Sequence, residues 1–162
     1  MSTVAILMGS KSDLAFVERI TTALDELGIR HERRVASAHK SARYLLDLLA
    51  EYEASGEVGV YITVAGRSNA LSGMVDAHVS APVIACPPYS EKFGGADLYS
   101  SLRMPSGVAP AVVLEPASAA LLAAKILGVG DAALRERVVA VQRAQAQHLI
   151  DVDRELRSSD AT

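Results

Sequence analysis

Hydrophobic and polar residues along this 162-residue chain alternate between two patterns. Short apolar runs bounded by glycine, proline or polar residues predict strands, and apolar residues spaced three and four apart predict helices. The expected strands are 4–8, 31–35, 58–64, 82–86 and 110–114. The expected helices are 14–27, 42–54, 71–78, 97–103, 118–127 and about 131–157. Strands and helices therefore alternate along nearly the whole chain.

This alternation predicts one α/β domain built on a parallel sheet. Strands joined by helical crossovers run parallel, and such a sheet needs helices on both of its faces. We expect a flavodoxin-like or Rossmann-like three-layer α/β/α fold with a five-stranded parallel sheet, the polar strand 31–35 near an edge, and a long C-terminal helix. A chain of this length with 50% hydrophobic residues fills one such core. The domain is expected over 1–157, followed by a disordered tail over 158–162.

Polar segments follow each of the first four expected strands. These segments are Gly9–Asp13, Ser37–Lys40, Ala65–Asn69 and Cys86–Ser90. An open parallel sheet binds ligands at the carboxyl ends of its strands, where these segments meet. Each segment alone fits a solvated turn, but together they deliver serines, a histidine, a lysine, an arginine and an asparagine to one edge. The pattern predicts a single ligand site there.

The first of these segments favours a phosphate-bearing ligand. Gly9 stops an apolar strand and permits a tight turn, and serines and an aspartate follow where a helix begins. Backbone N–H groups at a helix N-terminus bind anions such as phosphate. A plain turn in which Ser12 or Asp13 caps the helix fits the same residues. Neither a Walker phosphate loop nor the dinucleotide-binding fingerprint is present, so no particular nucleotide is indicated.

Composition excludes several classes of protein. A net charge of −3, a pI of about 5.8 and the lack of a basic block argue against nucleic acid as a partner. One cysteine, Cys86, excludes an internal disulfide and a cysteine-rich metal site, and its place beside two prolines favours a structural role. Apolar runs fall short of membrane-spanning length, and no signal-peptide pattern is present. We therefore expect a cytoplasmic protein that uses no metal, no cofactor and no membrane.

Five segments together resemble the purine-biosynthetic family that carboxylates aminoimidazole ribonucleotide. They are Gly9–Asp13, Ser37–Lys40, Ala65–Asn69, Pro82–Pro88 and Ser100–Gly107, and the resemblance spans residues 4–127. The family has two classes on one fold. One is a mutase that moves a carboxylate from the exocyclic nitrogen of N-carboxyaminoimidazole ribonucleotide to the ring carbon. The other is a carboxylase that uses carbon dioxide and aminoimidazole ribonucleotide directly, a reaction that needs neither biotin nor ATP.

Two positions resemble the carboxylase class more than the mutase class. The mutase typically carries Gly-Gly-Ala-Ala-His-Leu-Pro-Gly in the third loop, whereas 66–73 here reads Gly-Arg-Ser-Asn-Ala-Leu-Ser-Gly. Ala70 therefore stands where the mutase has a histidine, and Lys40 stands where it usually has arginine. The run Cys-Pro-Pro at 86–88 also resembles the carboxylase class. We expect a direct carboxylase acting on 5-aminoimidazole ribonucleotide, with the mutase reaction as the alternative.

This carboxylation needs a base, and His39 is the catalytic candidate. The carbon beside the amine of an aminoimidazole attacks carbon dioxide, and a base must then remove the ring hydrogen to restore aromaticity. Histidine exchanges protons near neutral pH, and a neighbouring cation such as Lys40 favours the neutral imidazole. A loop histidine is often only a surface residue, but the adjacent Ser37 and Lys40 and the resemblance favour a catalytic role here.

The residues expected to bind substrate lie in the first three loops. Lys40 and Arg67 are the cations available for the phosphate or the new carboxylate, and the sequence leaves their division open. Ser68 and Asn69 are candidates for hydrogen bonds to the substrate, although as turn residues they can also satisfy their own backbone. The full set is Gly9, Ser10, Ser12, Asp13, Ser37, Ala38, Lys40, Gly66, Arg67, Ser68 and Asn69.

The C-terminal helix is expected to join subunits. Apolar residues recur at spacings of three and four from Leu134 to Leu156, over a helix longer than a domain of this size can cover. The alternative is a helix half-packed on its own sheet with a frayed end. The resemblance implies a homo-oligomer, either a tetramer or an octamer.

A non-catalytic module that binds a phosphate-bearing ligand or a flavin is a more distant alternative. Flavin sites usually stack aromatic residues on the ring, and this chain has two Phe, five Tyr and no Trp. The composition therefore disfavours flavin.

Overall fold

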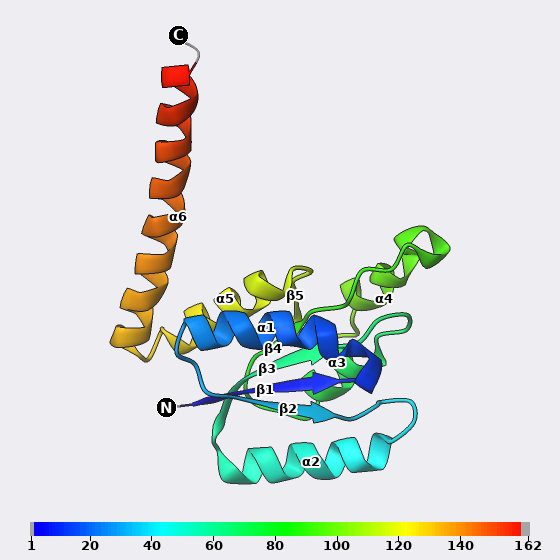
Figure 1. Ribbon diagram of the computed structural model, residues 1–162. Coiled ribbons are helices and arrows are strands. Elements are labelled where there is room, and N and C mark those ends of the chain that lie inside the picture. Colours follow the sequence, from blue (N-terminus) through cyan, green and yellow to red (C-terminus); the bar gives the residue numbers. More distant parts are fainter. Residues whose placement is uncertain (1, 160–162) are drawn as a thin grey trace.

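The computed structural model describes residues 2–159 and contains one five-stranded sheet in the order β2-β1-β3-β4-β5. Every neighbouring pair of strands runs parallel. The strands are β1 (Thr3–Met8), β2 (His31–Val35), β3 (Val58–Val64), β4 (Val83–Ala85) and β5 (Ala111–Val112). The predicted parallel sheet is confirmed, and the polar strand β2 lies at its edge (Figure 1).

Helices cover both faces of the sheet (Figure 1). The α-helices are α1 (Leu14–Glu26), α2 (Ala42–Ser55), α3 (Ala70–Asp76), α4 (Tyr99–Leu102), α5 (Pro116–Leu127) and α6 (Ala132–Ser159), and the 3₁₀ turns η1 (Lys11–Asp13) and η2 (Lys92–Leu98) precede α1 and α4. Successive side chains of a strand point to opposite faces. Val4, Ile6 and Met8 of β1 belong to the core shared with α1 and α5. Ala5 and Leu7 belong to a second core shared with α2 and α3, so β1 is buried on both sides.

The chain departs from the predicted pattern after β4. The sequence predicts a helix over 97–103, whereas the structure has η2 followed by the single turn α4. Phe93, Gly94 and Gly95 have φ angles of 54°, 60° and 78°, and this left-handed run cannot continue a right-handed helix. β4 and β5 are also shorter than predicted, and a proline, which has no N–H for the ladder, directly precedes each of them.

The C-terminal helix α6 packs on the domain only through its first turns. Leu134 and Val138 are buried, whereas the side chains from 142 to 159 are exposed. Figure 1 shows α6 projecting away from the sheet. The sequence predicts a disordered tail over 158–162. Ser158 and Ser159 instead belong to α6, and 160–162 lie outside the described residues. Among residues 2–159, no helix combines the length and the apolar character that a membrane span requires.

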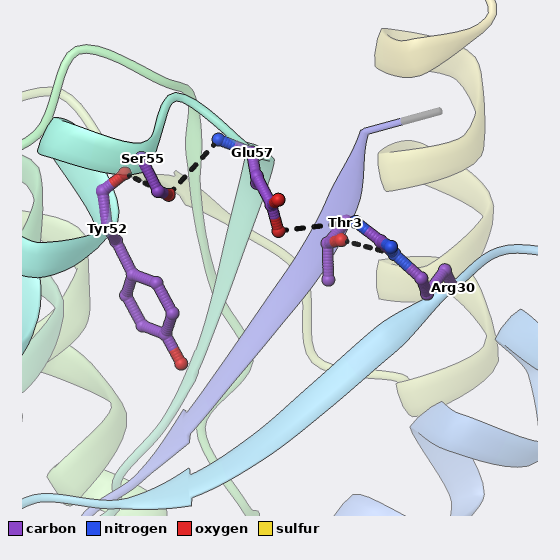
Figure 2. A network of polar contacts seen from close by, with 5 residues as sticks. All are labelled: Thr3, Arg30, Tyr52, Ser55 and Glu57. Carbon is purple, nitrogen blue, oxygen red and sulfur yellow. Dashed lines mark hydrogen bonds and ion pairs between the residues drawn. The ribbon is translucent and has the colours of Figure 1, made fainter.

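A network of hydrogen bonds and an ion pair connects the segments at the amino ends of the strands, which we call the amino edge of the sheet (Figure 2). The Arg30 side chain donates from Nε to Thr3 Oγ1 at 2.7 Å and from Nη2 to Glu57 Oε2 at 3.4 Å. The Thr3 N–H donates to the Glu57 carbonyl at 2.8 Å. Ser55 Oγ donates to the Tyr52 carbonyl at 2.9 Å and accepts from the Glu57 N–H at 3.3 Å. These contacts join the amino ends of β1 and β3, at the opposite end of the sheet from the predicted site.

Candidate active site

A cleft of about 650 Å³ opens at the carboxyl ends of β1, β2 and β3. The loops after these three strands and the loop after β4 supply nearly all of its lining. The lining residues are Gly9, Ser10, Ser12, Asp13, Ser37, Ala38, His39, Lys40, Ala65, Gly66, Arg67, Ser68, Leu71, Pro88, Tyr89, Ser90 and Lys92. Every residue expected at the site lies in this lining except Asn69.

The β1–α1 loop is a serine-capped turn. Ser10 is the N-cap of η1, and its Oγ accepts from the Ser12 N–H at 3.2 Å and from the Ser12 hydroxyl at 2.9 Å. The sequence predicts Ser12 or Asp13 as the cap, but η1 precedes α1 and moves the capping side chain back to Ser10. The Gly9 N–H donates to the Val64 carbonyl at 3.0 Å, which joins this loop to the end of β3.

The Asp13 carboxyl lies among partners from two loops. Partial burial raises its pKa above the ordinary value. Hydrogen bonding to the Ser10 backbone and the Ser12 side chain, and the positive charge of Arg67, lower the pKa by a smaller amount. Arg67 is therefore close enough to favour the Asp13 carboxylate, although the two residues follow different strands.

His39 and Lys40 occupy an exposed turn between β2 and α2. Serines hold this turn, because the Ser37 N–H donates to Ser41 Oγ at 2.9 Å and the Lys40 N–H donates to Ser37 Oγ at 3.2 Å. Within residues 2–159, no hydrogen bond or ion pair engages the His39 imidazole or the Lys40 ammonium. Both residues line the cleft, so their side chains are available to a substrate.

Arg67 and Asn69 have different places in the β3–α3 loop. Arg67 lines the cleft and has a left-handed backbone with a φ of 59°. Asn69 is buried and caps α3 by accepting from the Ser72 N–H at 3.2 Å. Its Nδ2 donates to Ser101 Oγ at 2.9 Å. The Asn69 amide is thus used inside the protein, as the turn-residue interpretation expects, whereas Ser68 lines the cleft.

The loop after β4 adds cleft residues that the sequence did not single out. Tyr89, Ser90 and Lys92 line the cleft. The position of this loop after β4 predicts that it reaches the same edge of the sheet. The individual residues that line the cleft could not be predicted, because a proline- and glycine-rich loop has no periodic pattern. In the part of the lining that the structure describes, Lys92 is a third cation beside Lys40 and Arg67.

Cys86 lies outside the cleft lining. It is fully buried, and its Sγ donates to the Leu114 carbonyl at 3.8 Å. Burial raises the pKa of the thiol to about 12, so the nucleophilic thiolate is scarce near neutral pH. These observations support a structural role for this cysteine. Within residues 2–159, no group of three His, Cys, Asp or Glu residues has a metal-binding arrangement.

Residues 3–148, which include all five strands, match a family model described as AIR carboxylase. The chain belongs to the AIR carboxylase family. This membership confirms the family that the loop motifs resemble.

Relatives in the AIR carboxylase family cover nearly the whole chain. Phosphoribosylaminoimidazole carboxylase of Archaeoglobus fulgidus is 54% identical over 152 residues, which are 94% of this chain and 83% of that protein. The protein of the same name from Treponema denticola is 51% identical over 154 residues, which are 95% of this chain and 97% of that protein. The bifunctional phosphoribosylaminoimidazole carboxylase/phosphoribosylaminoimidazole succinocarboxamide synthetase of Mus musculus is 44% identical over 128 residues, which are 79% of this chain and 30% of that protein.

A solved structure of the family has the same fold. The crystal structure of Treponema denticola PurE superposes with a TM-score of 0.94 and 50% sequence identity, covering 96% of this chain and 99% of that chain. The strand order β2-β1-β3-β4-β5 is the flavodoxin-like order. The predicted flavodoxin-like α/β/α fold is confirmed.

We predict that Asp13→Asn raises the melting temperature of the unliganded protein at pH 7 by up to about 3 °C. The folded-state pKa of this carboxyl is raised above its unfolded value, so its ionisation opposes folding at any pH above the folded-state pKa. Below the unfolded value of 3.8 both states are protonated and the penalty is absent. The gain over the wild type should therefore shrink as the pH falls toward 4. Melting curves followed by circular dichroism measure this gain.

The matched control for this prediction is Asp47→Asn, which changes an exposed carboxylate on α2. We expect the control to leave the melting temperature unchanged at pH 7. A lower melting temperature of Asp13→Asn at pH 7, or a gain of equal size at pH 4, would contradict the role of burial at Asp13.

Proposed function

We propose that this protein carboxylates 5-aminoimidazole ribonucleotide with carbon dioxide to give 4-carboxy-5-aminoimidazole ribonucleotide, in a reversible reaction of purine biosynthesis. The observation that carries the proposal is the cleft, in which a histidine, three cations and the serine turn after β1 meet at one edge of the sheet. The two relatives named phosphoribosylaminoimidazole carboxylase, with 54% and 51% identity, support it.

The β1–α1 loop suits the ribose phosphate of this substrate. Gly9, Ser10 and Ser12 line the cleft where η1 and α1 begin, and a helix N-terminus favours an anion. Asp13 is suited to the ribose hydroxyls, because a carboxylate accepts hydrogen bonds from hydroxyls and repels a phosphate. We therefore place the phosphate nearer the serines and the ribose nearer Asp13.

The cations of the cleft suit the two anionic groups of the product. Lys40, Arg67 and Lys92 line the same space, and the substrate phosphate and the new carboxylate each need positive charge. A guanidinium matches a carboxylate with two parallel hydrogen bonds, whereas an ammonium acts as a point charge. Positive charge placed in advance at the forming carboxylate lowers the barrier, because no rearrangement is needed during the reaction.

His39 is the base in this mechanism. The ring carbon beside the amine forms a bond to the carbon of carbon dioxide, and the electron pair of one C=O bond moves to oxygen to give a carboxylate. The neutral imidazole of His39 then takes the ring hydrogen as a proton, and the C–H electron pair restores the aromatic ring. In the reverse direction the imidazolium returns the proton and carbon dioxide leaves. Histidine suits both directions because it gains and loses protons near neutral pH.

The β3–α3 loop favours direct carboxylation over the mutase reaction. Ala70 is the first residue of α3, is exposed, and lies outside the cleft lining. Among the described residues of that lining, His39 is the one histidine. The described residues of this chain therefore bring no second imidazole to the cleft. The N-carboxyaminoimidazole ribonucleotide mutase reaction is the second candidate, because the same phosphate and ribose contacts would serve either substrate.

We also propose that α6 joins copies of this chain into a homo-oligomer. Leu149 and Leu156 are 70% and 60% exposed on a helix that extends away from its own domain. Exposed apolar side chains along one element favour a subunit interface.

Light scattering of the full chain should give the mass of a tetramer or an octamer. Truncation after Gly130 should lower the number of subunits in the oligomer or the solubility of the protein. A well-folded monomer with α6 intact would contradict this proposal.

We predict that His39→Asn abolishes turnover in both directions, while the affinity for 4-carboxy-5-aminoimidazole ribonucleotide falls by no more than about tenfold, roughly 1.4 kcal/mol. Asparagine keeps a polar side chain but cannot exchange a proton near neutral pH, and a base acts mainly in the transition state. Initial rates of carboxylation and decarboxylation test the first part, and calorimetric titration tests the second. His78→Asn is the matched control and should keep full activity, because His78 is exposed and lies outside the cleft lining. Near-normal rates in His39→Asn would remove His39 from the mechanism.

The choice of reaction class has its own test. We expect rapid turnover of aminoimidazole ribonucleotide with carbon dioxide supplied as bicarbonate, and an increase in the initial rate when carbonic anhydrase is added. The N-carboxylated isomer should react no faster than it decays to aminoimidazole ribonucleotide. Labelled carbon dioxide should enter the product. Rapid conversion of the N-carboxylated isomer without entry of the label would instead assign the mutase reaction.

A further inference from the structure

Buried polar side chains gather beneath the loop that carries Arg67. Six polar residues are buried among residues 2–159, and four of them are connected to one another. These four are Thr63, Asn69, Ser72 and Ser101. Burying polar groups costs free energy unless each finds a partner, so a connected set of them specifies one backbone geometry.

The hydrogen bonds of this cluster run from the sheet to α4. Ser72 Oγ donates to Asn69 Oδ1 at 2.9 Å, and the Thr63 and Ser72 hydroxyl oxygens are hydrogen-bonded at 2.7 Å. Asn69 Nδ2 donates to Ser101 Oγ at 2.9 Å. Thr63 lies on β3, Ser72 on α3 and Ser101 on α4, so the cluster fastens α4 beneath the β3–α3 loop.

The neighbouring serine, Ser100, contacts the backbone of the same loop. Its Oγ accepts from the Asn69 N–H at 3.0 Å. Ser100 Oγ also lies within donating distance of two carbonyl oxygens, that of Arg67 at 3.0 Å and that of Asp97 at 2.7 Å. One hydroxyl therefore bridges the backbone on both sides of Ser68.

The bridge bears on the backbone of Arg67. Arg67 has a φ of 59°, in the left-handed region that glycine adopts freely and that other residues rarely occupy. Such a conformation persists only where the surroundings hold it. The Ser100 bridge fixes the Arg67 carbonyl, whose direction depends on the φ and ψ angles of Arg67, and it also fixes the Asn69 N–H two residues later.

We propose that Ser100 is a positioning residue that holds Arg67 in its left-handed conformation and so aims its guanidinium at the anionic group of the substrate, while Ser101 supports the same loop through the Asn69 side chain. Neither serine lines the cleft, so both act through the loop. This inference rests on the proposed function, because it deepens the role of Arg67 in that cleft. It also assigns a role to the Ser100–Gly107 motif, which is otherwise remote from the chemistry.

The first test compares three serine variants. Ser100→Ala should lower kcat/KM by about tenfold, because a small displacement of a substrate-binding group reduces turnover strongly. The loss should divide between kcat and KM in the same way as in Arg67→Ala. Ser100→Thr keeps the hydroxyl and should recover most of the activity. Ser55→Ala is the matched control, since Ser55 also donates to the carbonyl three residues earlier and accepts a backbone N–H, but at the amino edge of the sheet. Unchanged kcat/KM in Ser100→Ala would overturn the proposal.

A double mutant separates positioning from general stability. In an Arg67→Ala background, Ser100→Ala should cause no further loss of kcat/KM, because the side chain that it positions is already absent. An equal loss in both backgrounds would show that Ser100 acts independently of Arg67 and would overturn the proposal.

A readout without substrate distinguishes this proposal from the proposed function. Amide hydrogen exchange of the Asn69 N–H should accelerate at least about tenfold in Ser100→Ala, and the Arg67 Nε–H resonance should shift in NMR spectra. A wild type that does not carboxylate aminoimidazole ribonucleotide would contradict the proposed function, and these spectra would still test the positioning. Unchanged exchange and an unchanged Arg67 resonance would contradict the positioning whatever the activity.

Discussion

The parallel pairing of β1 with β2 on one side and β3 on the other is the constraint on which the site depends. Met8, the last residue of β1, is in register with Val35 at the end of β2 and with Val64 at the end of β3. The three strands therefore stop in one row, and the next residues of each strand open onto the same space. Residues far apart in the sequence meet because the strands end together.

The site combines features that oppose stability with a scaffold that tolerates them. Asp13 is partly desolvated, and Arg67 has a left-handed backbone, which costs a non-glycine residue on the order of 1–3 kcal/mol. These features stand at the ends of β1 and β3, whose central residues are buried on both faces of the sheet. The hydrogen-bonded cluster between β3 and α4 adds support beneath Arg67. The burial of apolar side chains in β1 and β3 stabilises the fold enough to offset these unfavourable features at the cleft. The polar groups there can therefore be placed for binding and proton transfer.

The strands, the sheet edge and most of the cleft could be predicted from the sequence, because each depends on a local pattern. Apolar runs locate the strands, and the topology of a parallel sheet places the segments after them at one edge. The burial of Asn69 could not be predicted in this way, because it depends on a partner, Ser101, that a later helix supplies. The place of Lys92 in the cleft and the interruption of the helix at Phe93 could not be predicted either. The hydrophobic pattern contains no signal for left-handed backbone angles in a loop. What sequence reasoning missed is thus set by tertiary contacts and single dihedral angles.

The most direct test of the site is a crystal structure of the His39→Asn variant with 4-carboxy-5-aminoimidazole ribonucleotide. We expect the phosphate at the Gly9–Asp13 loop, the ring carbon that bears the carboxylate beside residue 39, and at least one of Lys40 and Arg67 at the carboxylate. A separate cavity of about 460 Å³, lined by Arg30 and Arg137 among other residues, lies at the amino edge of the sheet. A nucleotide bound in that cavity, with the cleft empty, would contradict the assignment of the active site.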